Sequence, residues 1–376
     1  MIRLTVPSIE QDDLAAVAEV LESGYLVQGP RVEGFERAVA ERVGVRHAVA
    51  VTNCTAAIQM ALLAAGVRAG DVVVTTAYSW PATANAVELC GAQPVFVDVR
   101  PDTFNIDPAA LEAVLARLMS CGETAGRTRA VLPVHAFGLL ADMPAIMGLA
   151  DRYGLAVVED AACALGAAAD GRQAGAWGAL GCFSFHPRKA VTTGEGGVVT
   201  TDDDAAARRL RALRNHGLDP AAPGPDFILP GFNNRMTEMQ GALGLTQMTK
   251  LDRIVAARRR AAARYDQLFE GSEFRPPVAA DHAAHVYQSY VIQLPPRLAA
   301  ARAELIAAAR GRGIETTIGT WHMPLVTYYR SRYGFRPGDF PVADDVFARS
   351  LTLPLHERLT EAEQGQVADF FLGHVA

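Results

Sequence analysis

Lysine is the residue that this chain of 376 residues almost entirely lacks. Lys189 and Lys250 are the only lysines, and the other 33 of the 35 basic residues are arginines. A base-composition bias in the coding DNA explains the preference, but a lysine that persists against it can mark a position where Arg cannot serve. Arg keeps its proton and cannot act as an amine nucleophile, whereas Lys can. Lys250 lies in the charged segment QMTKLDRIVAARRRAAARY, which predicts a solvated surface side chain.

The chain also has little of what several classes of protein require. Its five cysteines, odd in number and without CxxC spacing, argue against a disulfide framework or a zinc site and favour a reducing cytoplasm. A net charge of −6 with interspersed acids and bases disfavours nucleic-acid binding. No apolar run reaches the ~18 residues that span a bilayer, and the N-terminal MIRLTVPSIEQDD has no signal-peptide core. We therefore expect a cytoplasmic protein without nucleic-acid or membrane partners.

What is present is an alternation of apolar strand-like segments and helical segments. The strand candidates are 47–52, 72–76, 94–99, 130–135, 155–160, 181–185 and 197–201, and helical stretches such as TAAIQMALLAA separate several of them. Near-continuous apolar strands joined by helices are typical of an α/β protein with a mostly parallel central sheet covered on both faces. The length fits two domains, because single cores tend to stop growing near ~250–300 residues.

The second half of the chain predicts a smaller α+β domain. A helical region over 237–271 leads into it, followed by a strand over 286–294, an irregular stretch over 320–345 and a closing helix over 360–372. The Pro- and Gly-rich segment 218–231 predicts an exposed loop. We expect a large domain with an N-terminal arm over residues 1–249 and a small C-terminal domain over residues 250–376.

Ligands of open parallel sheets bind beyond the C-terminal ends of the strands, so the residues that follow each strand are the candidates for chemistry. Thr55 and the backbone of Ala56 begin a helix after the first strand, where free N–H groups and a hydroxyl suit a phosphate. Thr55 could equally be an ordinary N-cap. Trp80 follows the second strand and could be core filler or a platform for an aromatic ligand.

Asp160 and Lys189 follow two later strands. An acid that ends a buried strand is costly unless it is paired, so Asp160 either caps a helix or holds a protonated ring nitrogen. Lys189 lies on a tight turn, HPRK, beside the glycine-rich TTGEGG, and a surface-loop lysine is the alternative. A nucleophilic lysine, a ring-nitrogen acid, a phosphate cup and an aromatic platform together suit pyridoxal 5′-phosphate. No GxSxG, HExxH or GxxxxGK[ST] motif is present.

The sequence resembles the DegT/DnrJ/EryC1/StrS aminotransferases, which act on keto-sugars and have the aspartate-aminotransferase (type I) fold of pyridoxal-phosphate-dependent transferases. The matching segments extend over essentially the whole chain and include GYLVQGPRVEGFERAVAERVGVRHAVAVTNCTAA, VEDAACALGA, CFSFHPRKAVTTGEGG, RNHG and GFNNRMTEMQGALGLTQ. The FSFHPRK…TTGEGG and GFNNRM segments are specific in combination. The resemblance implies a transaminase that uses the pyridoxal and pyridoxamine forms (PLP/PMP) of the cofactor, with glutamate as the expected amino donor.

The resemblance also implies a role for each matching position. Lys189 matches the Schiff-base lysine and Asp160 the acid that pairs with the pyridine nitrogen. Trp80 matches the stacking aromatic, and the phosphate ligands match Thr55, Ala56 and Ser184. His186 matches a residue close to cofactor and substrate, although a satisfied structural histidine is the alternative.

Three positions add a partner or depart from the family pattern. Asn233 matches an asparagine that the partner subunit gives to the phosphate, which implies a homodimer with shared active sites. Asn53-Cys54-Thr55 replaces the common Ser-Gly-Thr or Ser-Ala-Thr. Cys163 stands where the family often has Gln or His, and the resemblance places that Gln near the cofactor's 3′ oxygen. A thiol is a weaker donor than an amide.

Two other functions are compatible with the fold. A sugar dehydratase of the family carries His at the Schiff-base position, and Lys189 argues against it. A regulator that binds the cofactor without catalysis would need a DNA-binding extension, for which the chain leaves no room. Residues 316–335, with Trp321, His322, Tyr328 and Tyr329, are expected near the substrate mouth.

Overall fold

The centre of the molecule is a seven-stranded sheet in a computed structural model that describes residues 1–278 and 283–374. In spatial order its strands are β1 (His47–Val51), β10 (Gly197–Thr201), β9 (Leu180–Ser184), β6 (Ala156–Asp160), β5 (Thr128–Leu132), β2 (Val72–Thr76) and β4 (Gln93–Val97). From β9 to β4 all neighbours are parallel, whereas β10 is antiparallel to both β9 and β1. The expected mostly parallel sheet is confirmed.

Helices cover both faces of this sheet. One face carries α3 (Cys54–Ala64), α4 (Ala82–Leu89) and α8 (Asp204–Arg214), and the other carries α2 (Pro30–Val43), α5 (Pro108–Ser120) and α7 (Met143–Tyr153). Within a strand the side chains alternate between the two cores, so Val49 packs with the first set of helices and Ala48 and Ala50 with the second. Burial on both faces explains why the strands read as unbroken apolar runs.

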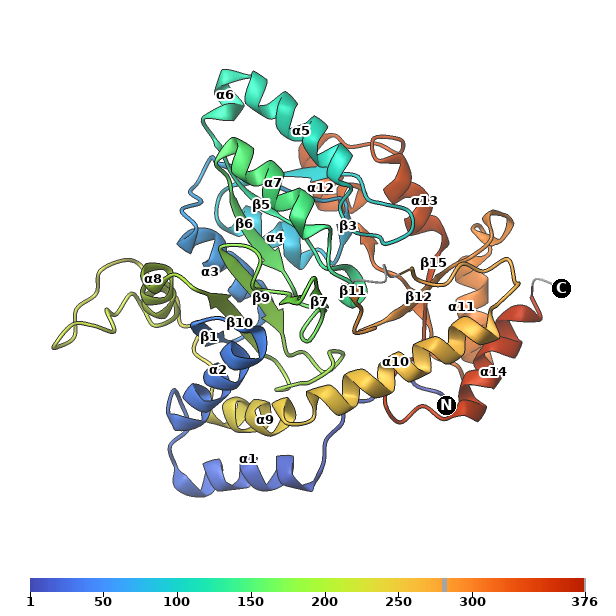
Figure 1. Ribbon diagram of the computed structural model, residues 1–376, viewed down its shortest axis with the longest axis horizontal. Helices are drawn as coiled ribbons and strands as arrows, with labels where there is room; N and C mark the ends of the chain where they lie inside the picture. Colours follow the sequence, from blue (N-terminus) through green and yellow to red (C-terminus); the bar gives the residue numbers. More distant parts are fainter. Residues whose placement is uncertain (279–282, 375–376) are drawn as a thin grey trace.

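A long helix connects the sheet region to the C-terminal part of the chain. After α9 (Glu238–Met248), α10 (Leu251–Leu268) runs from beside the sheet to α14 (Glu361–Leu372), as Figure 1 shows in yellow and red. There a second core forms between α10, α14, α11 (Arg302–Gly311) and an antiparallel sheet of β12 (Tyr290–Gln293), β15 (Ser350–Leu353) and β13 (Thr317–Ile318). The N-terminus lies beside this second core, where Ile2 pairs with Ile314 (Figure 1). The boundary between residues 249 and 250 stays a prediction.

The remaining elements are short or peripheral. They are α1 (Gln11–Ser23), β3 (Tyr78–Ser79), α6 (Gly122–Ala125), β7 (Ala168–Ala169), β8 (Arg172–Gln173), β11 (Ala283–Ala284), β14 (Trp321–His322), α12 (Thr327–Tyr333), α13 (Pro341–Arg349) and the 3₁₀ turns Ala136–Gly138, Pro296–Leu298 and Met323–Leu325. The antiparallel pair β3 and β14 ties the residues before Trp80 to the C-terminal part of the chain. The predicted loop over 218–231 is largely exposed and projects beyond α8 (Figure 1).

Two expectations about secondary structure were wrong. The stretch 320–345, expected to be irregular, contains α12 and the first residues of α13. Tyr329 of α12 and Phe340, which directly precedes α13, both pack against the Phe96 ring. The strand expected over 286–294 begins only at Tyr290, because Tyr287 adopts a left-handed φ of 47° that interrupts extended backbone.

Lys250 is not a solvated surface side chain. It lies between α9 and α10 and is buried, with its Nζ 2.7 Å from Asp12 and 2.6 Å from Asp13 of α1. Glu10 lies 3.7 Å away. The acids come from a helix more than two hundred residues earlier in the chain, so the pattern around Lys250 could not reveal them. In Figure 1, α1 lies alongside α9. The hydrogen bond from Lys250, which follows α9, to Asp13 of α1 connects the two helices.

Candidate active site

The strand ends that carry the candidate residues meet at one edge of the central sheet. β9, β6 and β2 are parallel, and β1 has the same direction because two antiparallel steps through β10 restore it. The segments after these four strands therefore leave the sheet on the same side. Electrostatic interactions among Lys189, Asp160, Cys54 and Cys163 reflect how closely these segments approach one another.

Lys189 is held on a turn that hydrogen bonds fix at both ends. The backbone N–H of Lys189 donates to the His186 carbonyl at 2.8 Å, and the Thr193 N–H donates to the Phe185 carbonyl at 3.0 Å. The side chain is partly buried, and its Nζ donates to Cys163 Sγ at 3.1 Å. This is not the surface-loop lysine of the alternative interpretation. Burial alone would lower the pKa of Lys189, but Cys163, Cys54 and Asp160 outweigh it and raise the pKa.

Asp160 ends β6 as a buried carboxylate. Its Oδ2 accepts a hydrogen bond from Thr83 Oγ1 at 2.7 Å, and its Oδ1 accepts one from the Ala162 N–H at 3.2 Å. Burial raises the pKa of Asp160 despite these bonds and the positive charge of Lys189. No helix follows directly, because turns occupy residues 161–167, so the helix-cap alternative does not apply. Within the described part of the chain no cation forms an ion pair with this acid.

The helix start after β1 has a different cap from the one considered. Asn53, not Thr55, is the N-cap of α3, and its Oδ1 accepts the Ala56 N–H at 2.9 Å. The Thr55 hydroxyl is therefore free of capping, whereas the Ala56 amide already has a partner. The close approach of this segment to β10 requires Gly197, since a Cβ there would lie 2.4 Å from the Asn53 carbonyl.

The other candidates surround this centre at different depths. Trp80 is 62% exposed and is therefore not core filler. Ser184, at the end of β9, is partly buried, and its Oγ accepts the His186 N–H at 3.4 Å. The Nδ1 of His186 accepts the Arg188 N–H at 3.2 Å, and its Nε2 lies 4.0 Å from Glu195. Burial, opposed by Glu195, lowers the pKa of His186, which favours the neutral imidazole at neutral pH.

Asn233 stands apart from these residues. It is exposed, and its backbone pairs with Asn215 beyond the end of α8. The next residue, Asn234, accepts the Thr52 N–H at 3.1 Å, which places this segment beside the end of β1. Within residues 1–278 and 283–374, the Asn233 side chain forms no hydrogen bond with Lys189 or Asp160. An exposed asparagine near the edge of the site suits a role toward another subunit, and that role stays a prediction.

Two residues of the site were missed from the sequence alone. Thr83, in α4, donates the shortest hydrogen bond to Asp160, and Cys54 lies in the electrostatic neighbourhood of both Asp160 and Lys189. Burial and the nearby Asp160 raise the pKa of Cys54 well above the usual thiol value. No spacing along the chain links Thr83 with Asp160, whereas Cys54 was visible as a departure from the family pattern.

These groups fit a phosphorylated pyridine aldehyde. A primary amine and a buried acid without an ion pair suit an aldehyde and a protonated ring nitrogen, and an exposed tryptophan offers a flat surface. The start of α3, with the free Thr55 hydroxyl, suits a phosphate. Clusters of three or more potential metal ligands are absent from residues 1–278 and 283–374. Over the same residues, no helix is both long and apolar enough to cross a bilayer.

Comparisons with known proteins agree with this chemistry. Residues 7–371 match the model of the DegT/DnrJ/EryC1/StrS aminotransferase family. The chain is 36% identical to the spore coat polysaccharide biosynthesis protein SpsC of Bacillus subtilis, over 97% of this chain and 95% of SpsC. It is also 36% identical to the GDP-perosamine synthase of Caulobacter vibrioides, over 97% of this chain and 96% of that enzyme. The structure of Spr1654 from Streptococcus pneumoniae in its PLP form superposes with a TM-score of 0.92 at 25% identity, over 99% and 98% of the two chains.

Proposed function

Because this chain belongs to the DegT/DnrJ/EryC1/StrS aminotransferase family, we propose that it transfers an amino group from an amino acid to a keto-sugar. The proposed donor is L-glutamate, and the proposed acceptor is a nucleotide-linked keto-sugar or a cyclitol ketone. The observation that carries the proposal is the meeting of Lys189 and Asp160 at one edge of the sheet, on the ends of β9 and β6. The similarity to a GDP-perosamine synthase supports a nucleotide-linked acceptor.

The proposed cofactor is pyridoxal 5′-phosphate, which alternates with its amino form. When bound, it supplies an aldehyde for an amine and a ring that accepts electrons from a carbanion. Lys189 binds it covalently, and Asp160 accepts a hydrogen bond from its protonated ring nitrogen. Thr55, Ser184 and the backbone at Ala56 hold the phosphate, with Ala56 depending on a shift of the Asn53 cap. Trp80 would stack on the ring, and Cys163 would take the position near its 3′ oxygen.

The protein's own groups then carry the proton. Lys189 Nζ takes a proton from the donor's α-carbon as a general base and returns it as a general acid. Burial raises the pKa of Asp160, but a protonated ring nitrogen opposite it would favour the charged carboxylate, and the carboxylate would in turn hold the proton on that nitrogen. His186, neutral at neutral pH and next to the lysine turn, contributes from the substrate side.

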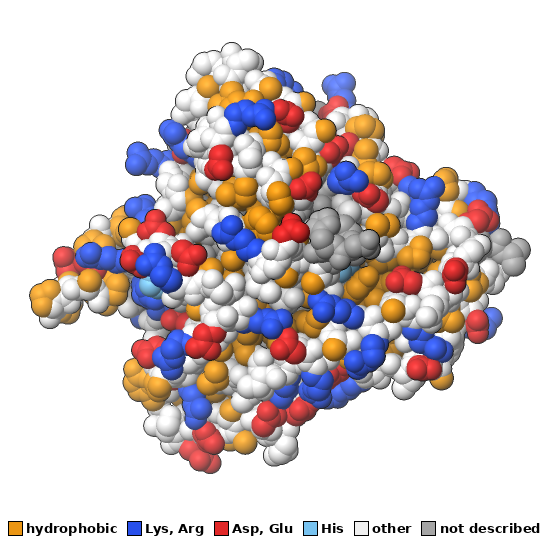
Figure 2. Space-filling model, in the orientation of Figure 1, with side chains coloured by type: hydrophobic (Ala, Val, Ile, Leu, Met, Phe, Trp, Pro, Cys, Tyr) orange, Lys and Arg blue, Asp and Glu red, His pale blue; other side chains and the backbone are white. Residues whose placement is uncertain are grey.

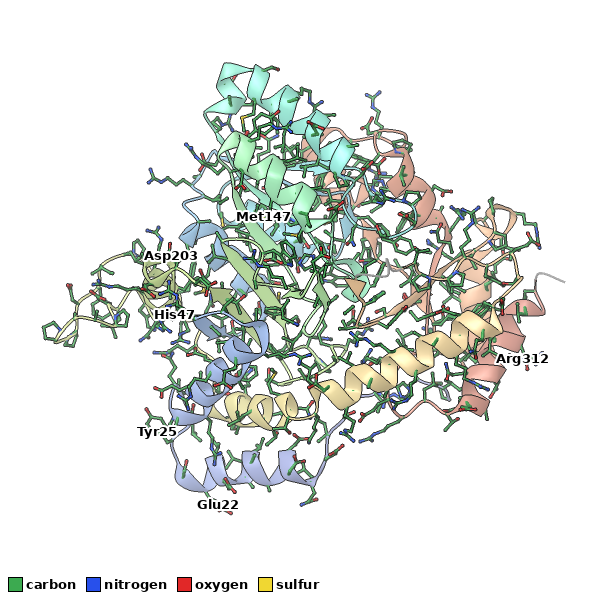
Figure 3. The ribbon with its side chains drawn as sticks, viewed as in Figure 1. Glu22, Tyr25, His47, Met147, Asp203 and Arg312 are labelled. Atoms are coloured by element: carbon green, nitrogen blue, oxygen red, sulfur yellow. The ribbon has the colours of Figure 1, made fainter. Side chains whose placement is uncertain are left out.

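The proposed assembly is a homodimer in which Asn233 reaches the phosphate of the neighbouring site. Large apolar side chains stay exposed on α1 and in the connection to α2: Leu14, Leu21, Tyr25, Leu26 and Val27. In Figure 3, Tyr25 lies at the margin of the molecule, in that connection. A second copy of the chain would remove this apolar surface from water.

A screen of keto-sugar nucleotides tests the proposed acceptor. The purified protein, loaded with cofactor, is incubated with glutamate and each of a set of UDP-, GDP- and dTDP-linked keto-sugars, and products are identified by mass spectrometry. We expect one class of keto-sugar to gain an amino group at the ketone carbon while glutamate becomes its keto acid. If none of the keto-sugar nucleotides is aminated but a cyclitol ketone is, the acceptor is a cyclitol ketone and not a nucleotide-linked sugar. A ketone that loses a hydroxyl group without gaining nitrogen would point to the dehydratase.

A further inference from the structure

The contact between Lys189 and Cys163 brings together two nucleophilic side chains that aminotransfer does not need as a pair. The Nζ and Sγ atoms lie 3.1 Å apart, within hydrogen-bonding distance. Lys189 forms no ion pair with a carboxylate in the described part of the chain, so the sulfur is the nearest recorded partner of the amine.

The backbone on each side holds the two atoms in place. Cys163 lies on the turn after β6, where the Ala164 N–H donates to the Ala161 carbonyl at 2.9 Å. Lys189 lies on the turn that its own N–H closes at the His186 carbonyl. Since hydrogen bonds fix both turns, a bond between the side chains requires movement of the side chains only. Such preorganisation favours a reaction between neighbours over a reaction with a group from solution.

The surroundings favour reaction at Cys163 over the other thiols near the site. Cys163 is partly exposed, so a small oxidant can reach it, whereas Cys182 is completely buried in β9. Cys54 is also partly exposed, but burial and the nearby Asp160 raise its pKa well above the usual thiol value, which disfavours its thiolate. Reactive cysteines occupy partly exposed positions next to positive charge, and the Lys189 ammonium supplies that charge here. Cys121, at the end of α5, is exposed, but neither lysine is close to it in the sequence. It therefore has no nearby amine in the sequence with which to form such a bond.

We propose that Cys163 and Lys189 form a reversible sulfur–nitrogen cross-link when a hydroperoxide reaches the site. In the first step, written for hydrogen peroxide, the Cys163 sulfur attacks one peroxide oxygen, the O–O and S–H bonds break, and a sulfenic acid and one water form. In the second step the Lys189 ammonium gives up a proton to water, the resulting amine attacks that sulfur, the N–H and S–O bonds break, and a second water leaves. The sulfur loses two electrons and the peroxide gains them. Two thiols reverse the link, restore Cys163 and the free amine, and leave as a disulfide.

The link would block the amine on which the proposed transamination depends. Sulfenic acids are known to condense with nearby nitrogen as well as with thiols, and the 3.1 Å contact selects the amine here. The inference itself does not rest on the proposed function, because it needs only the contact and the oxidant. It gives the chain a way of losing and regaining activity with the redox state of its surroundings.

Peptide mapping tests the link in cofactor-free protein treated with hydrogen peroxide. The scarcity of lysine makes the map simple, because trypsin leaves Cys163 in peptide 153–172 and a modified Lys189 in peptide 189–208. We expect these two peptides to be joined, with the loss of two hydrogen atoms from the intact protein and recovery after addition of dithiothreitol. Cys163→Ser should lose the link, and the matched variant Cys54→Ser should keep it. Cys163→Ala serves if the serine variant does not fold.

Two results would overturn the proposal. The first is a sulfinic acid on Cys163 with an unmodified Lys189. The second is a disulfide between peptide 153–172 and peptide 47–68, which holds Cys54 and produces the same change in intact mass. Loading with pyridoxal 5′-phosphate before the peroxide should suppress the link. That single arm depends on the proposed function, so its failure alone would count against the cofactor assignment and not against the cross-link.

Discussion

The two lysines of the chain show how differently one residue type is used. Lys189 lies on a turn beside a sulfur and a buried acid, whereas Lys250 lies among three carboxylates of the N-terminal segment. Scarcity indicated a special role for Lys189, whereas Lys250 was predicted to be a surface charge and is instead buried. Only Lys189 has the neighbours that amine chemistry needs, since Lys250 is neutralised by its ion pairs.

Asp160→Asn should make the cofactor-free protein more stable at neutral pH while it slows amino transfer. Burial raises the pKa of Asp160 in the folded protein, so the folded state binds the proton more tightly than the unfolded chain does. The charged form therefore costs stability at neutral pH, and the cost disappears as the pH falls below the ordinary value of 3.8. Chemical denaturation of both proteins across this pH range measures the effect.

The exposed Asp226→Asn serves as the control and should leave the pH dependence unchanged. The glutamate-dependent loss of the bound cofactor's visible absorbance should slow by more than about tenfold in Asp160→Asn, or ~1.4 kcal/mol. A cofactor-free variant that is less stable at neutral pH would mean that Asp160 is a structural acid.

Trp80→Ala should weaken cofactor retention and leave folding stability nearly unchanged. The side chain is 62% exposed, and surface substitutions usually change stability by less than about 0.5 kcal/mol. Stacking on an aromatic ring contributes about 1 kcal/mol, which Trp80→Phe should largely preserve. Cofactor titration and thermal unfolding of the cofactor-free proteins separate the two effects. Normal cofactor affinity combined with a lower melting temperature would contradict the stacking role.

At the scale of elements, much of the architecture could be read from the sequence. The strands over 72–76 and 197–201 were predicted to the residue, because both faces are buried and the runs consist mainly of β-branched Val and Thr without a charged residue. The pairing of β3 with β14 was not predictable, because each strand has only two residues and the two lie more than two hundred residues apart in the sequence. The helices within 320–345 were missed because aromatic packing on Phe96, rather than apolar periodicity, stabilises them.

The same limit applies to the active site. The residues directly after strands could be placed, because parallel strands end at one edge of a sheet. Thr83 could not be placed, because its contact with Asp160 depends on how α4 packs. Thr55 was considered as an alternative N-cap of α3, but Asn53, two residues earlier and also a good cap, has that role.

Lys250→Met should destabilise the protein by about 3 kcal/mol, because it leaves the buried Asp13 carboxylate without its cation. Burial alone would raise the pKa of Asp13, but hydrogen bonds from Lys250, Thr246 and Gln247 lower it below 3.8. The stabilisation is therefore present above that pH and is lost as the pH falls through the lowered pKa. Denaturant unfolding at neutral and acidic pH measures it.

Arg253→Met is the matched control, because Arg253 pairs with Glu10 on the surface of the next helical turn. A surface ion pair contributes about 0–1 kcal/mol, so this variant should stay close to the wild type. If both substitutions lowered the free energy of unfolding equally, the ion pairs of Lys250 with α1 would contribute no more than a surface ion pair.

At the scale of the whole molecule, the charge distribution disfavours nucleic acid as a partner, whereas the exposed apolar surface favours a second copy of the chain. Lys, Arg, Asp and Glu side chains are interspersed over the face in Figure 2, so that face offers no basic surface for nucleic acid. The exposed apolar residues of α1 and its connection to α2, with the projecting loop that carries Phe227, are surfaces that a second copy could cover. These features support the proposed homodimer.

Mixed dimers test the shared site. Lys189→Ala and Asn233→Asp should each give a nearly inactive homodimer, because the first removes the amine and the second repels the phosphate. If Asn233 serves the neighbouring site, a mixed dimer collects both lesions in one site and leaves the other intact. Co-expression with two different affinity tags and purification of the mixed species should restore up to one working site per dimer. Activity no higher than that of the two parents would place Asn233 in its own subunit's site.

The most direct test of the central claim is the half-reaction of Lys189→Arg with glutamate. Wild-type protein loaded with pyridoxal 5′-phosphate should lose its visible absorbance when glutamate is added, with one keto acid formed per site. Lys189→Arg keeps the positive charge but cannot bond to the cofactor or move the proton, because arginine does not give up its own. The account predicts a variant without that absorbance and without keto acid. A coloured Lys189→Arg protein that converts glutamate at the wild-type rate would contradict it.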